Sequence, residues 1–279
     1  MTSARAPAIK GPGPLTRRAE AAHAHSIALC AREMSEATKR PAEGDGAGTP
    51  SFKKQKTEGR MTLYHWYPYR STRAMWAINE VGKQEDTDIV FVNTDPKTEE
   101  EKALLENYRA NVHPLGTIPA LVLESGEVLV ESGAICLYLA EKYGKLRPSG
   151  DDVKEKVHFL NWFSVATTTL DALLMDLHGL LHGPGAEGKK SEEDVKKLEK
   201  AKEKFSKLLK ALDDHLDGRD FIAGGVFTLA DLLVAYDLFW ARFLDADGSL
   251  FKPFSRVNTF VDAMLARDGF KNAGTFENK

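Results

Sequence analysis

Cysteine is scarce in this sequence, and it contains no long hydrophobic runs. Among 279 residues there are only two cysteines, Cys30 and Cys136, which lie far apart and offer no disulfide framework. A reducing compartment is therefore expected. No apolar run approaches the roughly 20 residues that a membrane-spanning helix needs, so no membrane partner is expected.

An excess of positive charge is also missing. The 38 lysines and arginines are balanced by 41 acidic residues, for a net charge of −3, which argues against a broad nucleic-acid-binding surface. Glycine-rich phosphate-binding motifs are absent as well. His178 and His182 stand four residues apart, as zinc ligands do, but no third ligand follows at a usable spacing. We expect neither nucleic acid nor a metal as partner.

Residues 1–60 are rich in small and polar residues and show no hydrophobic period, which predicts a disordered extension. Its arginine-containing first half resembles an organellar transit peptide. Lys39-Arg40, followed after twelve residues by the basic run Lys53–Lys56, resembles a bipartite nuclear localisation signal. The third interpretation is an untargeted tail. We expect a cytoplasmic protein, with nuclear or organellar targeting as the alternatives.

Residues 61–144 alternate short β-rich runs with helical patterns and close with a hairpin and a helix. The expected order is β-α-β-α-β-β-α, a small mixed sheet covered by helices. The expected elements are strand Thr62–Tyr67, helix Ser71–Gly82, strand Asp88–Asn93, helix Thr98–Ala110, strands Ala120–Leu123 and Glu127–Val130, and a helix from Ser132 to Gly144.

Residues 145–151 form a linker with proline and glycine, and residues 152–279 have the pattern of an all-helical domain. Val153–Leu181 is a nearly continuous helical pattern, and Ser191–Leu216 is a long amphipathic one. Thr228 and Asp231 stand three apart, as in a capping box with Asp in place of Glu. The apolar segment that follows predicts a buried central helix.

Residues 113–144 carry the clearest functional pattern. Ile118-Pro119 precedes the first strand of the hairpin, and the closing helix opens on Glu131-Ser132. A strand edge is thereby brought next to a helix N-terminus, where free N–H groups favour anions. A ligand with a peptide backbone and a carboxylate fits both features.

These motifs resemble the glutathione-binding half of cytosolic glutathione transferases. The resemblance implies a thioredoxin-like domain followed by an all-α domain, and a cis peptide bond before Pro119. It assigns the cysteinyl backbone of glutathione to Ile118 and the γ-glutamyl end to Glu131 and Ser132. His113 and Thr117 complete the expected binding site, although relatives often have a longer Lys or Gln in place of Thr117.

The same resemblance implies an enzyme that conjugates the glutathione thiolate to an electrophilic organic compound in detoxification. Glutathione is the co-substrate, no metal is needed, and the protein is a homodimer. The second substrate is expected between the two domains, against Trp162, Phe163, Thr167 and Leu170. The alternative is a non-catalytic interaction or regulatory module, because folds are reused for functions other than their best-known one.

Three hydroxyl groups are candidates for activating glutathione: Tyr69, Ser71 and Tyr67, in that order of preference. Arg70-Ser71-Thr72-Arg73 with Trp76 is similar to the bacterial and fungal serine-type pattern Ser-Arg-Ser-x-Arg, but Tyr69 replaces its first serine. A phenol is more acidic than a serine hydroxyl and is therefore the better donor to a thiolate. The stretch contains no cysteine, which disfavours thiol-transfer chemistry.

Overall fold

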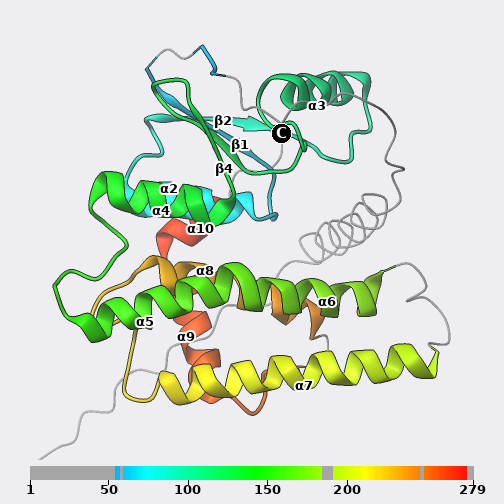
Figure 1. Ribbon diagram of the computed structural model, residues 1–279, viewed down its shortest axis with the longest axis vertical. Helices are drawn as coiled ribbons and strands as arrows, with labels where there is room; N and C mark the ends of the chain where they lie inside the picture. The colour runs from blue at the N-terminus through cyan, green and yellow to red at the C-terminus, as the bar shows by residue number, and fades with distance from the viewer. Residues whose placement is uncertain (1–53, 57–58, 184–190, 246–247, 275–279) are drawn as a thin grey trace, which may run out of the picture.

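The computed structural model describes residues 54–56, 59–183, 191–245 and 248–274 (Figure 1). A sheet with helices on both faces forms one end of the molecule, and a bundle of longer helices forms the other (Figure 1). The predicted disordered extension lies outside the described residues up to position 53, as do Lys39-Arg40 and Lys53. No helix in the described part of the chain is long and apolar enough to cross a bilayer.

The sheet has four strands in the order β2-β1-β3-β4: β1 (Met61–His65), β2 (Thr87–Phe91), β3 (Ala120–Val122) and β4 (Val128–Val130). β1 runs parallel to β2, and β3 runs antiparallel to both β1 and β4. In β1 the side chains of Met61, Leu63 and His65 are buried, and the two between them are partly exposed. This alternation is the period of two that a strand imposes.

Helices cover both faces of this sheet. α2 (Ser71–Val81) and α4 (Ser132–Tyr143) lie together on the face toward the helical domain, and α3 (Glu99–Asn111) lies on the other (Figure 1). A capping box of Thr98 and Glu101 begins α3, and left-handed glycines end α2 and α4. The predicted order of elements and the thioredoxin-like architecture are confirmed.

The helical domain contains one long helical segment and a buried central helix. The long segment comprises α5 (Val153–Ser164), a π-helical turn (Val165–Leu170) and α6 (Asp171–His182), and α7 (Glu192–His215) lies alongside it (Figure 1). The central helix α8 (Leu229–Leu244) is almost wholly buried. The predicted capping box is confirmed: the Asp231 carboxylate accepts the backbone N–H of Thr228 at 2.7 Å.

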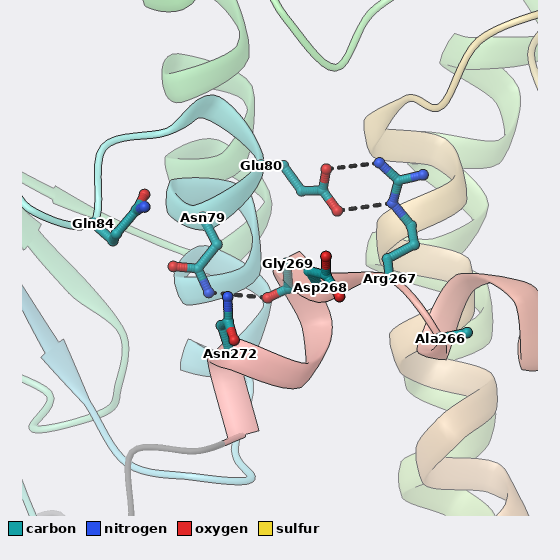
Figure 2. Close-up of a pocket in the computed structure, with 8 residues that line it drawn as sticks. All are labelled: Asn79, Glu80, Gln84, Ala266, Arg267, Asp268, Gly269 and Asn272. Carbon is teal, nitrogen blue, oxygen red and sulfur yellow. Dashed lines mark hydrogen bonds and ion pairs between the residues drawn. The ribbon is translucent and has the colours of Figure 1, made fainter. Parts of the chain in front are cut away.

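α9 (Ser255–Leu265) and α10 (Asp268–Gly274) bring the end of the described chain back to the sheet domain. Figure 2 shows the cleft between α10 and the C-terminal part of α2. Across it, Glu80 accepts two hydrogen bonds from Arg267 at 2.8 Å each, and Asn79 donates to the Gly269 carbonyl at 2.9 Å. These paired groups fasten α10 to α2, at the opposite end of α2 from the predicted site.

Lys54–Lys56 lie against the sheet domain. The Gln55 N–H donates to the Gly126 carbonyl at 2.7 Å, and Lys54 pairs with Glu127 at 2.9 Å. Contacts with the β3–β4 hairpin therefore begin before Met61, the residue at which the sequence places the start of this domain.

Candidate functional site

Strand register gathers the predicted site at one end of the sheet. Ala120 pairs with Val130 in the β3–β4 ladder and with Tyr64 in the β1–β3 ladder. Because these ladders are antiparallel, three segments emerge at the same end of the sheet: Pro119, Glu131 and the segment that leaves β1 after His65. The loop 113–119, the start of α4 and the start of α2 therefore meet, although they are far apart in sequence.

The loop before β3 is fixed by α3. Tyr108 donates its hydroxyl to the Thr117 carbonyl at 2.6 Å, and the Tyr108 carbonyl accepts the His113 N–H at 2.9 Å. The Ile118–Pro119 bond is cis, as the resemblance implies. The sequence predicts an exposed strand edge here, but β3 lies between β1 and β4 and has no free edge. Ile118 precedes both ladders, which begin at Ala120, so the ladders do not use its backbone groups and an extended ligand can pair with them.

His113 and Thr117 face each other inside this loop. The His113 Nδ1 accepts the Leu115 N–H at 3.3 Å, and Nε2 lies 3.0 Å from the Thr117 Oγ1. Burial lowers the pKa of His113, although Glu131 opposes this shift. Because Nδ1 accepts a hydrogen bond, the ring proton is on Nε2. The Thr117 hydroxyl oxygen accepts a hydrogen bond from this N–H group. The proton of the Thr117 hydroxyl can then be donated to another acceptor. Thr117 is exposed, whereas His113 is buried.

Glu131 and Ser132 form the helix start that the sequence predicts. Glu131 is exposed and has a φ of 67°, a region that few residues other than glycine adopt. Ser132 is the first residue of α4 and is only 5% exposed. An exposed carboxylate beside a helix N-terminus suits a ligand group that carries an ammonium and a carboxylate together.

A buried ionic cluster lies behind Ser132. Arg73 donates to Asp171 at 3.0 Å and to Asp237, and Arg70 donates to the same Asp171 at 2.8 Å. Burial alone would raise the pKa of Asp171, but the charges and hydrogen bonds of Arg73 and Arg70 outweigh it and lower this pKa. Burial raises the pKa of Asp237 to about 7, against the attraction of Arg73.

Sequence analysis missed both of these aspartates. Asp237 interrupts an otherwise apolar stretch of α8, which is a weak signal of a buried partner for a cation. Asp171 carried no signal, because it contacts arginines about a hundred residues earlier in the chain.

The three candidate hydroxyls are in different surroundings. Ser71 is fully buried, and its Oγ accepts the Trp66 N–H at 3.0 Å, lies 3.0 Å from the Trp66 carbonyl and 2.8 Å from His65 Nδ1. These contacts tie the start of α2 to β1 and occupy the hydroxyl. Burial lowers the pKa of His65 to about 4, so this ring is neutral.

Tyr67 and Tyr69 flank Pro68, and the Tyr67–Pro68 bond is also cis. The Pro68 carbonyl accepts hydrogen bonds from Tyr236 at 2.8 Å and Trp240 at 3.1 Å, both on α8. The Tyr67 ring packs beside Gly274 of α10, and burial raises its pKa.

Tyr69 is half-buried and is held in a turn by its N–H bond to the Trp66 carbonyl at 3.0 Å. It stands between two residues that the helical domain anchors: Pro68 by α8, and Arg70 by α6. These contacts fix the backbone of the turn that carries Tyr69, whereas the Ser71 hydroxyl itself is engaged by His65 and Trp66.

The four residues predicted to contact a second substrate separate into two groups. Phe163 and Thr167 face the start of α4: a Cβ on Gly133 would lie 2.8 Å from the Thr167 methyl and 3.7 Å from the Phe163 ring. Trp162 packs instead on His215 of α7, with 5.5 Å between ring centroids, and Leu170 is completely buried in the core. Phe163 and Thr167 therefore border the start of α4, next to Ser132.

Among the described residues, no three His, Cys, Asp or Glu side chains come together as metal ligands. The His178 and His182 rings do approach each other, at 5.6 Å between centroids, without a third ligand of these types.

Known proteins resemble this chain in sequence and in fold. Family models for the N-terminal and C-terminal domains of glutathione S-transferase match residues 70–142 and 195–263. Glutathione S-transferase PM239X14 of Arabidopsis thaliana is 33% identical over 169 residues, which cover 60% of this chain and 74% of the relative.

Two further matches extend the comparison. Elongation factor 1-gamma of Artemia salina is 29% identical over 178 residues, which cover 62% of this chain but only 36% of that protein. A solved sphingomonad glutathione S-transferase, complexed with glutathione, superposes with a TM-score of 0.59 and 26% identity over 76% of this chain and 96% of its own.

Proposed function

Because this chain belongs to the glutathione S-transferase family, we propose that it conjugates the thiolate of glutathione to electrophilic organic compounds in detoxification. The observation that carries the proposal is the meeting, at one end of the sheet, of the Ile118-Pro119 loop, the Glu131-Ser132 helix start and the anchored turn at Tyr69. These segments offer backbone groups that can pair with a peptide, a carboxylate site and a hydroxyl donor.

In the proposed complex, glutathione lies beside the loop that precedes β3. The Ile118 backbone pairs with its cysteinyl unit. Ser132 and the N-terminus of α4 hold the carboxylate of its γ-glutamyl end, and Glu131 holds the ammonium group. The glycyl carboxylate accepts the hydroxyl proton of Thr117, whose oxygen is already engaged by His113.

The proposed chemistry is a displacement or an addition. The glutathione thiol loses its proton to solvent, and the Tyr69 hydroxyl donates a hydrogen bond to the resulting thiolate. The sulfur forms a bond to the electrophilic carbon. In a displacement the leaving group departs with its electron pair, and in an addition the electron pair of the broken π bond takes a proton from solvent. Phe163 and Thr167 provide the nearest surface for the electrophile. Holding the electrophile next to the thiolate aligns the two reactants and so accelerates the reaction.

Retention on immobilised glutathione, followed by turnover of 1-chloro-2,4-dinitrobenzene with glutathione, tests the proposal. We expect specific elution with free glutathione and turnover above the uncatalysed rate. Absence of both retention and turnover contradicts it.

The second candidate is a non-catalytic interaction module, favoured by the similarity to elongation factor 1-gamma. Retention without turnover, with glutathione and a panel of electrophiles, would support this candidate.

We also propose a homodimer in the cytoplasm, as the family resemblance implies, with the basic segments of the N-terminal extension leaving nuclear or organellar targeting as alternatives. Light scattering at micromolar concentration tests assembly, and a monomer contradicts it. A fluorescent reporter fused to the full chain tests location: diffuse cytoplasmic signal is expected, and accumulation in one organelle contradicts it.

A further inference from the structure

The charged side chain of Arg73 is only 2% exposed, and it contacts a residue of the candidate site. It lies on α2, and its NH1 donates to the Ser132 Oγ at 3.2 Å. Its NH2 is bound to Asp171 and Asp237, and its guanidinium lies 4.9 Å from the centre of the Tyr236 ring. These contacts on α6 and α8 fix the direction in which NH1 points.

This contact sets the orientation of the Ser132 hydroxyl. A serine oxygen has one proton to donate and two lone pairs to accept. One lone pair receives the Arg73 N–H, so the hydroxyl proton cannot point toward Arg73. The adjacent positive charge also polarises the hydroxyl and strengthens it as a donor. Ser132 is therefore held as a donor at the first residue of α4, where backbone N–H groups also favour an anion.

We propose that Arg73 is a positioning residue that presets Ser132 to donate to the γ-glutamyl carboxylate of glutathione. The inference rests on the proposed function, in that glutathione must be the ligand of this site. Arg73 touches neither glutathione nor the reacting sulfur. It acts through Ser132, and Asp171 and Asp237 hold it in place from the helical domain.

The test is a binding cycle with two ligands, measured by calorimetry on the full chain. One ligand is glutathione, and the other is 4-aminobutanoyl-cysteinylglycine, which lacks only the γ-glutamyl carboxylate. The proteins are the wild type, Arg73→Lys, Ser132→Ala and the double variant. A lysine has a single ammonium and cannot reproduce the fork that reaches Ser132 and the aspartates together.

We expect Arg73→Lys to weaken glutathione binding about tenfold, in line with the loss of a charge-assisted hydrogen bond. Binding of the analogue is expected to stay unchanged. In the Ser132→Ala background, Arg73→Lys should have no further effect on glutathione. Equal weakening of both ligands, or effects that add in the double variant, would show a merely structural role and overturn the proposal.

Arg267→Lys is the matched control, because Arg267 likewise joins α2 to the helical domain through a carboxylate, in a bidentate pair with Glu80 away from Ser132 (Figure 2). It should leave binding of both ligands unchanged. If Arg73→Lys does not fold, the double variant Arg73→Gln with Asp237→Asn replaces it, because it removes both charges of the buried pair. The results expected for Arg73→Lys then apply to this variant. Wild-type protein that binds neither ligand refutes glutathione as ligand altogether, whereas binding without turnover refutes only the transferase activity.

Discussion

At the scale of single residues, the account depends on which hydroxyl faces the glutathione sulfur. The alternatives could be stated from the sequence but not decided there, because Tyr67, Tyr69 and Ser71 lie within five positions. Packing separates them: Ser71 is buried and engaged by His65 and Trp66, whereas Tyr69 is half-buried in an anchored turn.

Tyr69→Phe should cut turnover about ten- to a hundredfold, since a hydrogen bond to a charged partner contributes about 1.5–3 kcal/mol. The Michaelis constant for glutathione should change little, because the peptide contacts remain. Steady-state kinetics with an aryl halide checks this, with Tyr67→Phe as the matched control. Full activity in Tyr69→Phe together with loss in Tyr67→Phe would reverse the assignment.

His65 gives the sheet domain a pH dependence. Burial lowers its pKa to about 4 in the folded protein, against about 6.5 when unfolded. Between these values the unfolded chain binds the extra proton, so stability falls as pH drops from about 6.5 to 4, by up to roughly 3 kcal/mol.

Urea unfolding of the wild type and His65→Gln across this range measures the effect. The variant should lose much of the slope, since the other titratable groups, Asp237 among them, are the same in both proteins. An equal slope in both proteins would show that His65 does not cause it.

At the scale of elements, the sequence predicted the order and nature of the helices and strands, with boundaries shifted by a residue or two. β1, for example, ends at His65 and not at Tyr67. The π-helical turn at Val165–Leu170 was not predicted, because one extra residue in a turn hardly changes an apolar pattern. The return of α10 to α2 depends on long-range pairs such as Asn79 with Gly269, which no local pattern encodes.

The contact between α4 and the π-helical turn requires Gly133. An alanine there would place its Cβ 2.8 Å from the Thr167 methyl, an overlap that costs about 1–3 kcal/mol if the helices cannot adjust. Gly133→Ala should therefore push the start of α4 away and weaken glutathione binding.

Adding Thr167→Ser removes the clashing methyl and should restore much of both stability and binding. Thermal melting and calorimetry of the single and double variants provide the check. Losses that persist unchanged in the double variant would show that this contact is not the cause.

At the scale of the whole molecule, two domains share one site. The sheet domain supplies the loop before β3 and the helix start, and α6 and α8 hold Arg70, Arg73 and Pro68. The loop and the helix start were predictable because their motif is local, from residue 113 to 144. The ionic cluster was not, because its members lie up to 164 residues apart.

The N-terminal extension is predicted to be dispensable for this architecture. Residues 1–53 have little of the apolar content that a core needs, while Lys54 and Gln55 already contact the hairpin. Removing residues 1–53 should leave melting temperature and activity nearly unchanged in side-by-side assays with the full chain. A fall of several degrees would show that the extension docks on the folded part.

Activation of glutathione by this protein can be read from the pKa of the glutathione thiol in the complex. Ultraviolet absorbance of the thiolate, titrated against pH with the full chain in excess, reports it without any second substrate. If Tyr69 donates to the thiolate, we expect the pKa of the bound thiol to lie at least one unit below that of a free thiol, which is about 8.5. In Tyr69→Phe, the pKa of the bound thiol should return toward this value. A bound thiol that titrates as it does in free solution would contradict this expectation.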